Sequence, residues 1–598
     1  MISRIRNFSI IAHIDHGKTT LTDQLLLSAG NLTPNQFHER MLDSNPIEQE
    51  RGITIKLAPV RLNYRFQNLD YQLNLIDTPG HVDFSYEVSR SLSACEGAIL
   101  LVDATKGVQA QTIANYDKAL AQGLTIIPVI NKIDLPNADI QKVTHELQSF
   151  FGFSPKEIIQ VSAKTGYNID QLFQAIISRI PAPKPPSNHA LKALIFNSTF
   201  HPHKGVIAFI RLFSGKINPQ NLNQLLLYQN HQSLSPLEIG FFNPQMQPTQ
   251  QLTAGQVGYL ATGLKDIHLV QVGDTLTERH AHIQPIKGYR KPKPMVYMDL
   301  YPLDAKDYGL LVKALAKLAL NDAALTYKST ASPALGHGFR VGFLGILHAE
   351  IVNERLRREF QLDVINTSPS VPYRLILNNG QIKTISSPTE FPDPSSIKTI
   401  QEPIVNLTIY TPKTYLGSIM ELCESKRAVF QDMQYLNNRV KLQYTFPLIE
   451  LIINFYDRLK SISSGYASIQ YEHAGYQSID AVKVDILLNH KPVPAFSFIA
   501  PKSTAEIQAR ALVNKLKDLI PRQQFELPIQ AAIGGRIIAR QTLKAFRKDV
   551  TAKLYGGDRT RRLKLLEKQK RGKKRMKQLG SVNLPPEVFT AVLKLDTF

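Results

Sequence analysis

A stretch near the amino terminus, residues 10–20, constrains the fold more than any other part of the chain. It reads Ile-Ile-Ala-His-Ile-Asp-His-Gly-Lys-Thr-Thr and lies between the apolar run Phe8 to Ile11 and a leucine-rich stretch. This order predicts a strand, a turn and a helix, with backbone N–H groups of the turn and the positive helix end converging on phosphate oxygens. Lys18 would add a positive charge and Thr19 a hydroxyl for Mg²⁺. The stretch therefore predicts a phosphate-binding loop, although Ala12 stands where the general pattern has glycine.

Apolar runs of strand length recur after this loop and alternate with helical patterns. They are Leu73 to Asp77, Ala98 to Asp103, Thr125 to Asn131 and Ile158 to Ser162. Such alternation predicts a parallel sheet covered by helices. Ligands bind at the carboxyl ends of the strands of such sheets, so polar residues there are candidates for the site.

Two polar segments fit the phosphate end of a nucleotide site. In Arg51-Gly52-Ile53-Thr54-Ile55 the threonine could reach Mg²⁺ and the γ-phosphate. In Asp77-Thr78-Pro79-Gly80-His81 the carboxylate could hold Mg²⁺, and the glycine N–H could approach the γ-phosphate. His81 could orient an attacking water, although an isolated histidine is more often a surface or core residue.

Two further strand ends indicate which base is bound. Asn131-Lys132-Ile133-Asp134 ends one strand, and Ser162-Ala163-Lys164 ends the last. The Asp134 carboxylate can accept hydrogen bonds from N1–H and the 2-amino group of guanine, and adenine offers neither donor. Each motif is weak alone, but five motifs at strand ends or on loops in one order predict a guanine nucleotide site.

These motifs define three sets of expected site residues. The expected nucleotide-binding residues are His13, Ile14, Asp15, His16, Gly17, Lys18, Thr19, Thr20, Asn131, Lys132, Asp134, Ser162, Ala163 and Lys164. The expected Mg²⁺ ligands are Thr19, Thr54 and Asp77, and the expected catalytic residues are His81, Lys18 and Gly80.

Length and composition set the frame for the rest of the chain. At 598 residues it is too long for one core. Its net charge of +21 points to a polyanionic partner, with RNA, DNA and an anionic membrane surface all allowed. Two distant cysteines exclude a disulfide framework and fit a reducing compartment. No signal or transit peptide is expected before the phosphate loop, and no apolar run is long enough to cross a bilayer.

The patterns divide the chain into six expected regions, which together predict a multidomain α/β protein. These are a P-loop GTPase domain at 1–187, a β-barrel domain at 188–286, a ferredoxin-like α+β domain at 287–370, a Pro- and Ser-rich connector at 371–402, a second ferredoxin-like domain at 403–480 and a basic C-terminal RNA-binding domain at 481–598. The two ferredoxin-like domains share the order strand, helix, strand, strand, helix, strand. The barrel shows no site pattern, and the glycine-rich residues 336–345 suit packing and function equally well.

Positive charge is concentrated near the carboxyl terminus. Residues 536–577 hold 17 Lys and Arg against three acidic residues, a local charge of +14. A surplus this dense repels itself unless a polyanion neutralises it, so we expect salt-sensitive phosphate contacts with little sequence information. The expected RNA-binding residues are Arg536, Arg540, Lys553, Arg559, Arg561, Arg562, Lys573, Lys574, Arg575 and Lys577.

The GTPase motifs together resemble those of the translational GTPases. The carboxy-terminal half resembles the LepA family, also called elongation factor four, and the likeness covers nearly the whole chain. The segments that carry it are Leu459 to Ser468, Pro521 to Glu526, Ala531 to Arg536, Thr551 to Asp558 and Gly572 to Lys577. The family pattern is not matched at Asn45 to Glu50, at Asn197 to His203 or at Ser464, where arginine is expected.

The resemblance implies a function for the chain. It implies a monomeric, ribosome-activated GTPase with GTP or GDP and Mg²⁺ as cofactors. Large-subunit rRNA would engage the GTPase domain, and the C-terminal domain would approach tRNA in the peptidyl site. It also implies a role in back-translocation of tRNAs or in translation fidelity under stress, in the cytoplasm. No arginine finger stands out in the motifs, so slow intrinsic turnover and an external activator are expected.

Three alternatives remain open on the sequence. One is a GTP-dependent ribosome assembly factor. Another is a GTP switch that uses its basic tail on an anionic membrane, peripheral on the cytoplasmic face of the cell membrane. The third, a forward translocase, is disfavoured by the short connector between the ferredoxin-like domains.

Overall fold

The fold is described here from a computed structural model of the chain. It describes residues 2–30, 46–51, 54, 57–79, 84–186, 189–266, 269–281, 283–286, 294–320, 322, 324–332, 335–436, 439–546, 548, 550–551, 559–579 and 588.

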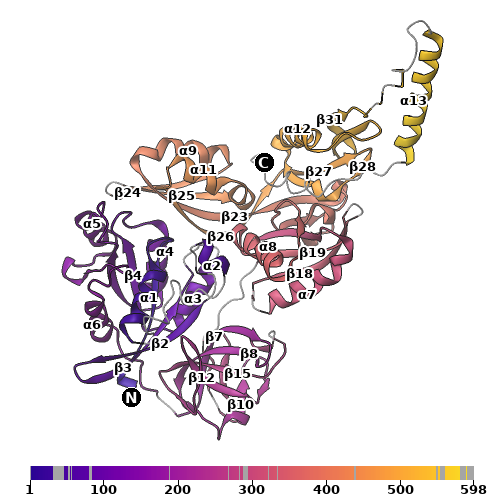
Figure 1. Cartoon of the computed structure of the whole chain (residues 1–598). Helices are drawn as coiled ribbons and strands as arrows, with labels where there is room; N and C mark the ends of the chain where they lie inside the picture. Colours follow the sequence, from indigo (N-terminus) through magenta and orange to yellow (C-terminus); the bar gives the residue numbers. More distant parts are fainter. Residues whose placement is uncertain are drawn as a thin grey trace.

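The amino-terminal region is built on a six-stranded sheet covered by helices on both faces (Figure 1). Its elements are β1 (Ile5–Ala12), α1 (Lys18–Ser28), α2 (Pro46–Arg51), β2 (Ala58–Phe66), β3 (Leu69–Asp77), α3 (Ser85–Ser93), β4 (Gly97–Asp103), α4 (Ala110–Ala121), β5 (Thr125–Asn131), α5 (Ile140–Phe151), β6 (Ile159–Gln160) and α6 (Ile169–Arg179). The strand order is β2-β3-β1-β4-β5-β6, with β2 antiparallel to β3 and the other pairs parallel. Apolar side chains of α1 and α6 fill one face, and those of α3, α4 and α5 fill the other. The carboxyl ends of the parallel strands therefore meet at one edge, as the sequence predicts.

The next region is an antiparallel sheet of eight strands, the expected β-barrel domain. Its strands, with the separate pair β9 and β14, are β7 (Lys192–His201), β8 (Gly205–Ser214), β9 (Lys216–Ile217), β10 (Leu225–Leu227), β11 (Ser233–Leu234), β12 (Glu238–Asn243), β13 (Gln245–Pro248), β14 (Leu252–Thr253), β15 (Val257–Ala261) and β16 (Thr275–Glu278). The region is anchored to the first sheet by Arg211, which is 1% exposed and lies 2.7 Å from Glu96. Asn7 of β1 donates to the same carboxylate at 2.7 Å.

The first ferredoxin-like domain has the order expected from the sequence. Its elements are β17 (Val296–Pro302), α7 (Tyr308–Ala319), β18 (Thr326–Ser332), β19 (Gly336–Phe343), α8 (Ile346–Phe360) and β20 (Val364–Asn366). The antiparallel sheet runs β18-β19-β17-β20, and α7 and α8 supply apolar side chains to its core. The expected fold of this domain is confirmed.

The second ferredoxin-like domain repeats the plan with one break. Its elements are β23 (Ile397–Pro412), α9 (Leu416–Ser425), β24 (Val429–Leu436), β25 (Arg439–Pro447), α10 (Leu448–Ile452), α11 (Phe455–Ile462) and β26 (Ser468–Ile479). The second helix, expected to be continuous, is divided in two because Asn454 adopts the left-handed conformation, with φ of 56°. A residue in that region cannot continue a right-handed helix.

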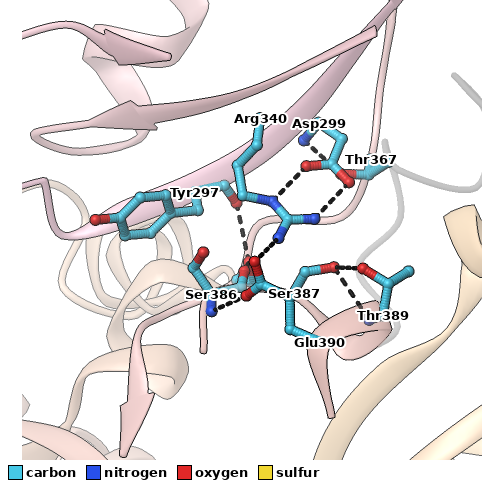
Figure 2. Close-up of polar contacts among 9 residues, drawn as sticks. Tyr297, Asp299, Arg340, Thr367, Ser386, Ser387, Thr389 and Glu390 are labelled. Carbon is cyan, nitrogen blue, oxygen red and sulfur yellow. Dashed lines mark hydrogen bonds and ion pairs between the residues drawn. The ribbon is translucent and has the colours of Figure 1, made fainter. Parts of the chain in front are cut away.

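Residues 371–402, expected to be a connector, are ordered as part of the second sheet. Strands β21 (Tyr373–Leu377) and β22 (Ile382–Ile385) form a hairpin, and β21 pairs with the first half of β23. Figure 2 shows how the same segment is tied to the first ferredoxin-like domain. The buried Arg340 of β19 binds Asp299 of β17 at 2.7 and 2.9 Å and reaches Glu390 at 3.1 Å. The segment therefore fastens the two domains together.

The C-terminal region has its own sheet and core. Its elements are β27 (Ala481–Leu488), β28 (Lys491–Pro492), β29 (Phe498–Pro501), α12 (Lys502–Leu519), β30 (Leu527–Ile533), β31 (Arg536–Leu543) and α13 (Arg559–Leu579). Tyr301 and Ile365 of the first ferredoxin-like domain belong to its apolar core. In Figure 1, α13 projects at the end of the molecule opposite the amino-terminal region.

Candidate active site

The phosphate-binding loop joins β1 to α1 through a turn that ends at Gly17. Gly17 has φ of 88°, and its carbonyl accepts the first helical hydrogen bond, from Leu21 N, at 2.9 Å. A Cβ at this position would lie 2.5 Å from Asn131 Nδ2. Both the backbone conformation and this close approach require glycine, because other residues rarely adopt a positive φ and would collide with Asn131.

The first helical residue, Lys18, is joined to the end of β3. Its Nζ lies 2.9 Å from Asp77 Oδ1 and also donates to the carbonyl of Thr78. Lys18 is 9% exposed and Asp77 is fully buried. Thr78 Oγ1 donates to the Ile10 carbonyl at 2.9 Å, which holds the β3 end against β1. The structure thus brings together the expected phosphate-binding lysine and the expected Mg²⁺ ligand.

The motifs expected to bind guanine are linked to the phosphate loop by side-chain hydrogen bonds. Asn131 Nδ2 donates to the His16 carbonyl at 3.0 Å, and its Oδ1 accepts from Ala163 N at 3.0 Å. Lys132 Nζ donates to the Asp15 carbonyl at 2.6 Å. Asn131, the last residue of β5, therefore connects the phosphate loop with the loop that follows β6. Lys132, the next residue, adds a second bond to the phosphate loop.

The expected base-reading carboxylate is held in place by the last motif. Ser162 Oγ donates to Asp134 Oδ1 at 2.7 Å and accepts from Thr165 N at 3.2 Å. Asp134 is exposed, and its carboxylate can accept further hydrogen bonds. Lys164 is exposed on the same loop.

Asp103, at the end of β4, belongs to this arrangement but is absent from the expected site residues. It is 1% exposed, its Oδ2 lies 2.7 Å from Lys132 Nζ, and its Oδ1 accepts from Thr105 N at 2.8 Å. Burial opposes its ionisation, but the hydrogen bonds from Lys132 and Thr105 hold the pKa of the carboxyl below its usual value. The same strand-end rule that selected Asp77 would have found it, because Asp103 ends the apolar run Ala98 to Asp103.

The remaining expected residues are described only in part. Thr54 is buried between α2 and β2, and Thr19 is half-buried on α1. His13 and Ile14 are half-buried in the phosphate loop, and Thr20 is exposed on α1. Gly80 and His81 lie outside the described residues, so their assigned roles stay predictions.

Family models match three parts of the chain. The family model described as the elongation factor Tu GTP binding domain matches residues 3–182. The model of the elongation factor G C-terminus matches residues 399–487, and that of the GTP-binding protein LepA C-terminus matches residues 488–594.

Curated relatives match the chain along its whole length. An elongation factor 4 from Geobacillus thermodenitrificans is 51% identical over 99% of this chain and 98% of its own. Those from Desulfitobacterium hafniense and Fusobacterium nucleatum are 50% and 51% identical, over 99% of this chain and 99% and 98% of their own. The chain belongs to the elongation factor 4 (LepA) family. It is a translational GTPase that binds guanine nucleotides, and this membership implies interaction with the ribosome.

A solved structure supports the fold of this elongation factor 4 family member. The crystal structure of a protein from Thermus thermophilus matches with a TM-score of 0.58 at 17% identity. The match covers 80% of this chain and 97% of the other. At this identity the likeness concerns the fold alone.

His16 of the phosphate loop is a fully buried histidine. Its Nδ1 accepts a hydrogen bond from Asp103 N at 3.2 Å, so the ring proton of the neutral form lies on Nε2. Burial lowers the pKa of His16 to about 3, although the nearby Asp103 carboxylate acts in the opposite direction. The imidazole is therefore neutral at physiological pH.

We expect His16 to make the stability of the GTPase domain depend on pH. The unfolded state gains a proton on this histidine near pH 6.5 and the folded state only near pH 3, so the contribution is complete above pH 6.5 and is lost as the pH falls below it. The loss should reach about 1 kcal/mol between pH 7 and pH 5.5. Urea unfolding of the nucleotide-free protein would measure it, with His16→Gln as the control. Equal losses in the two proteins would contradict the assignment.

The ten basic residues expected to bind RNA fall into three groups. Arg536 and Arg540 are exposed on β31, and Arg559, Arg561 and Arg562 are exposed at the start of α13. Lys573 instead donates to the carbonyls of Gln524 and Phe546, which attaches α13 to the sheet. Lys553 lies outside the described residues, and the side chains of Lys574, Arg575 and Lys577 are not among those described. All ten stay predictions as RNA contacts.

Nothing in the described part of the chain has the form of a membrane-spanning helix, since no helix there is both long and apolar enough.

Proposed function

We propose that this LepA-type GTPase hydrolyses GTP to GDP and phosphate when the ribosome activates it, and that it serves back-translocation of tRNAs and translation fidelity under stress. The observation that carries the catalytic part is the contact between Lys18 and Asp77, which joins the phosphate loop to the end of β3. The residues of the guanine motifs are hydrogen-bonded to the same loop. One edge of the sheet can therefore hold both ends of the nucleotide.

Mg²⁺ is the proposed second cofactor, and the residues present fit it. Asp77 Oδ2 is buried and has no hydrogen-bond partner among the described residues, while Oδ1 is bound by Lys18. A hard cation prefers such a carboxylate oxygen, together with hydroxyls and phosphate oxygens. Thr19, Thr54 and Asp77 would hold the ion, which when bound would neutralise charge on the β- and γ-phosphates.

The protein's own groups would then position the nucleotide and the water. Lys18 would bind phosphate oxygens, and Gly80 would donate its N–H to the γ-phosphate. His81 would orient the attacking water, because the water would donate a hydrogen bond to the imidazole. Asp134 would select guanine, with Ser162 holding the carboxylate in place.

The basic C-terminal region is the proposed RNA-binding part, with rRNA and tRNA as its partners. The exposed arginines expected to bind RNA lie on β31 and at the start of α13, and these elements are at the opposite end of the molecule from the amino-terminal region. The two regions could therefore contact different parts of one ribosome. We also propose that the protein acts as a monomer in the cytoplasm. The boundaries assigned to the regions stay predictions.

The experiment that tests this function is GTP hydrolysis by the full-length protein with and without ribosomes. We expect ribosomes to raise turnover by roughly 10³-fold or more, as external activators of slow GTPases do. His81→Ala should reduce the stimulated rate by about a hundredfold, because a positioned proton acceptor is lost. No stimulation by ribosomes would contradict the proposal.

A second set of variants tests the basic region by measuring ribosome binding at several salt concentrations together with GTP hydrolysis. Arg559→Ala with Arg562→Ala should weaken ribosome binding and reduce its salt dependence, because phosphate contacts release counterions. The intrinsic rate should not change, since these residues are remote from the nucleotide. Binding of vesicles containing anionic lipid, with RNA as competitor, would reveal the membrane alternative, and immature subunits in cells lacking the protein would favour the assembly role.

A further inference from the structure

Helix α8 of the first ferredoxin-like domain contacts both chain segments that flank the expected γ-phosphate site. Near its start, the His348 ring lies 6.1 Å from that of Phe84, three residues after His81. Near its end, Arg358 binds Glu50, four residues before Thr54. The two contacts are ten residues apart on one helix, about 15 Å along its axis. A single rigid element thus touches the segment before Thr54 and the segment after His81.

The contact at the start of α8 is fixed by buried hydrogen bonds. His348 is 2% exposed, and its Nδ1 accepts from Leu344 N at 3.1 Å. Its Nε2 therefore carries a proton and donates to Asp322 at 2.7 Å. Burial favours the neutral form of Asp322, but His348, the Ala324 N–H and Arg355 together hold the pKa of this carboxyl below its usual value. Because the ring cannot turn without breaking both bonds, α8 presents a fixed surface to Phe84.

The contact at the end of α8 has the geometry of a specific ion pair. Arg358 Nη1 and Nη2 each lie 2.7 Å from one oxygen of Glu50, and Arg358 Nε donates to Glu354 at 2.5 Å. Glu354 therefore orients the guanidinium toward α2. Two parallel N–H···O bonds fix direction as well as distance, which a lysine could not do.

The helix that carries Glu50 leads directly to Thr54. Helix α2 ends at Arg51, and its residues Ile47 and Glu48 are nearly fully buried. Thr54 is also buried, with 4% of its surface exposed. Three residues span at most about 10 Å, so the position of α2 limits where Thr54 can lie.

We propose that Arg358 is a positioning residue for GTP: its ion pair with Glu50 holds α2 so that Thr54 is placed to meet the γ-phosphate and its metal ion. This inference rests on the proposed role of Thr54. It predicts that the pair favours GTP over GDP, because only GTP has the phosphate that Thr54 would reach. The ion pair then links the position of the first ferredoxin-like domain to the preference for GTP over GDP.

The test is equilibrium binding of GDP and of a non-hydrolysable GTP analogue to full-length variants. Both partners of the pair are partly exposed, so the effect is modest. Arg358→Ala should lower the preference for the GTP analogue about two- to fivefold and leave GDP binding unchanged. The loss should shrink at high salt, which screens the pair. Arg357→Ala is the matched control, because Arg357 is 62% exposed and its ion pair, at 3.1 Å, is with Glu354 of the same helix.

Two further variants separate positioning from a general loss of structure. Glu50→Arg with Arg358→Glu should restore part of the preference, since the pair is re-formed with its charges exchanged while the new carboxylate at position 358 is repelled by Glu354 one turn away. Arg358→Lys should restore part of it, because charge is kept and the second hydrogen bond is lost. In hydrolysis assays Arg358→Ala should raise KM for GTP with little change in kcat.

Thr54→Ala distinguishes failure of this inference from failure of the proposed site. If Thr54→Ala lowers the preference for the GTP analogue and Arg358→Ala does not, the positioning role is overturned and the site stands. If neither variant changes the preference, the role assigned to Thr54 is wrong as well. An equal loss in Arg357→Ala and Arg358→Ala would also overturn the positioning role.

Discussion

Lys18→Ala is expected to weaken binding of GTP and GDP by roughly 30- to 5,000-fold, equivalent to about 2–5 kcal/mol for loss of one partner of a buried charged contact. The lysine is 9% exposed and is already held at the turn by Asp77 and the Thr78 carbonyl. Little of its conformational freedom remains to be lost when phosphate binds. Isothermal titration of the purified protein with each nucleotide would measure the effect.

The same substitution should also destabilise the nucleotide-free protein. It would leave the Asp77 carboxylate buried without its cation, which typically costs about 3–5 kcal/mol. Lys18→Ala combined with Asp77→Asn should recover part of this loss, because the uncompensated charge is removed. Lys106→Ala is the control, since Lys106 is exposed near the same loop and lies 3.9 Å from Asp15. If Lys106→Ala matched Lys18→Ala in both assays, the specific role of Lys18 would be refuted.

Asp134→Asn is expected to reverse the base preference of the site. The carboxylate can accept from both N1–H and the 2-amino group of guanine, whereas an asparagine amide would direct its own N–H groups at that amino group. A site built to hydrogen-bond a polar group of its ligand typically discriminates by roughly 10⁴-fold against an analogue that cannot form that bond. Xanthine nucleotides carry a carbonyl in place of the 2-amino group, so they should bind the variant in preference to GTP.

Competition between GTP and xanthosine triphosphate for the variant and the parent protein would measure this reversal. Asp139→Asn is the matched control, because Asp139 caps α5 by accepting from Lys142 N at 2.9 Å. Asparagine caps helices as well as aspartate does, so this variant should keep both stability and base preference. A variant at 134 that still preferred GTP by the parental ratio would remove Asp134 from the base-reading role.

The parts of the fold that follow simple periodic rules were predictable from the sequence. The apolar runs that end at Asp77, Asp103 and Asn131 are strands β3, β4 and β5, because buried parallel strands are continuous apolar runs. The order of strands and helices in the first ferredoxin-like domain was also predictable from the pattern of apolar residues. The contacts between these parts could not be predicted, because pairs such as Arg358 with Glu50 join residues 308 positions apart.

The hairpin of β21 and β22 was missed for a different reason. Its segment was expected to be a connector because it is rich in Pro and Ser, and its strands are only five and four residues long. The turn between them contains Asn378-Asn379-Gly380, and Gly380 has φ of 80°. Asn-Gly is a strong hairpin signal, so the turn itself carried the information that the composition concealed.

The junction between β26 and β27 limits how the C-terminal region can move. β26 ends at Ile479 and β27 begins at Ala481, so a single residue, Asp480, separates the two sheets. The C-terminal sheet is therefore joined to the second ferredoxin-like domain without a spacer that could stretch or coil. The distance between the nucleotide site and the C-terminal sheet is therefore restricted. Under the RNA-binding role proposed for the C-terminal region, a bound ribosome would have to present its RNA at a matching distance from the nucleotide site, so this distance would help to select the ribosomal conformation.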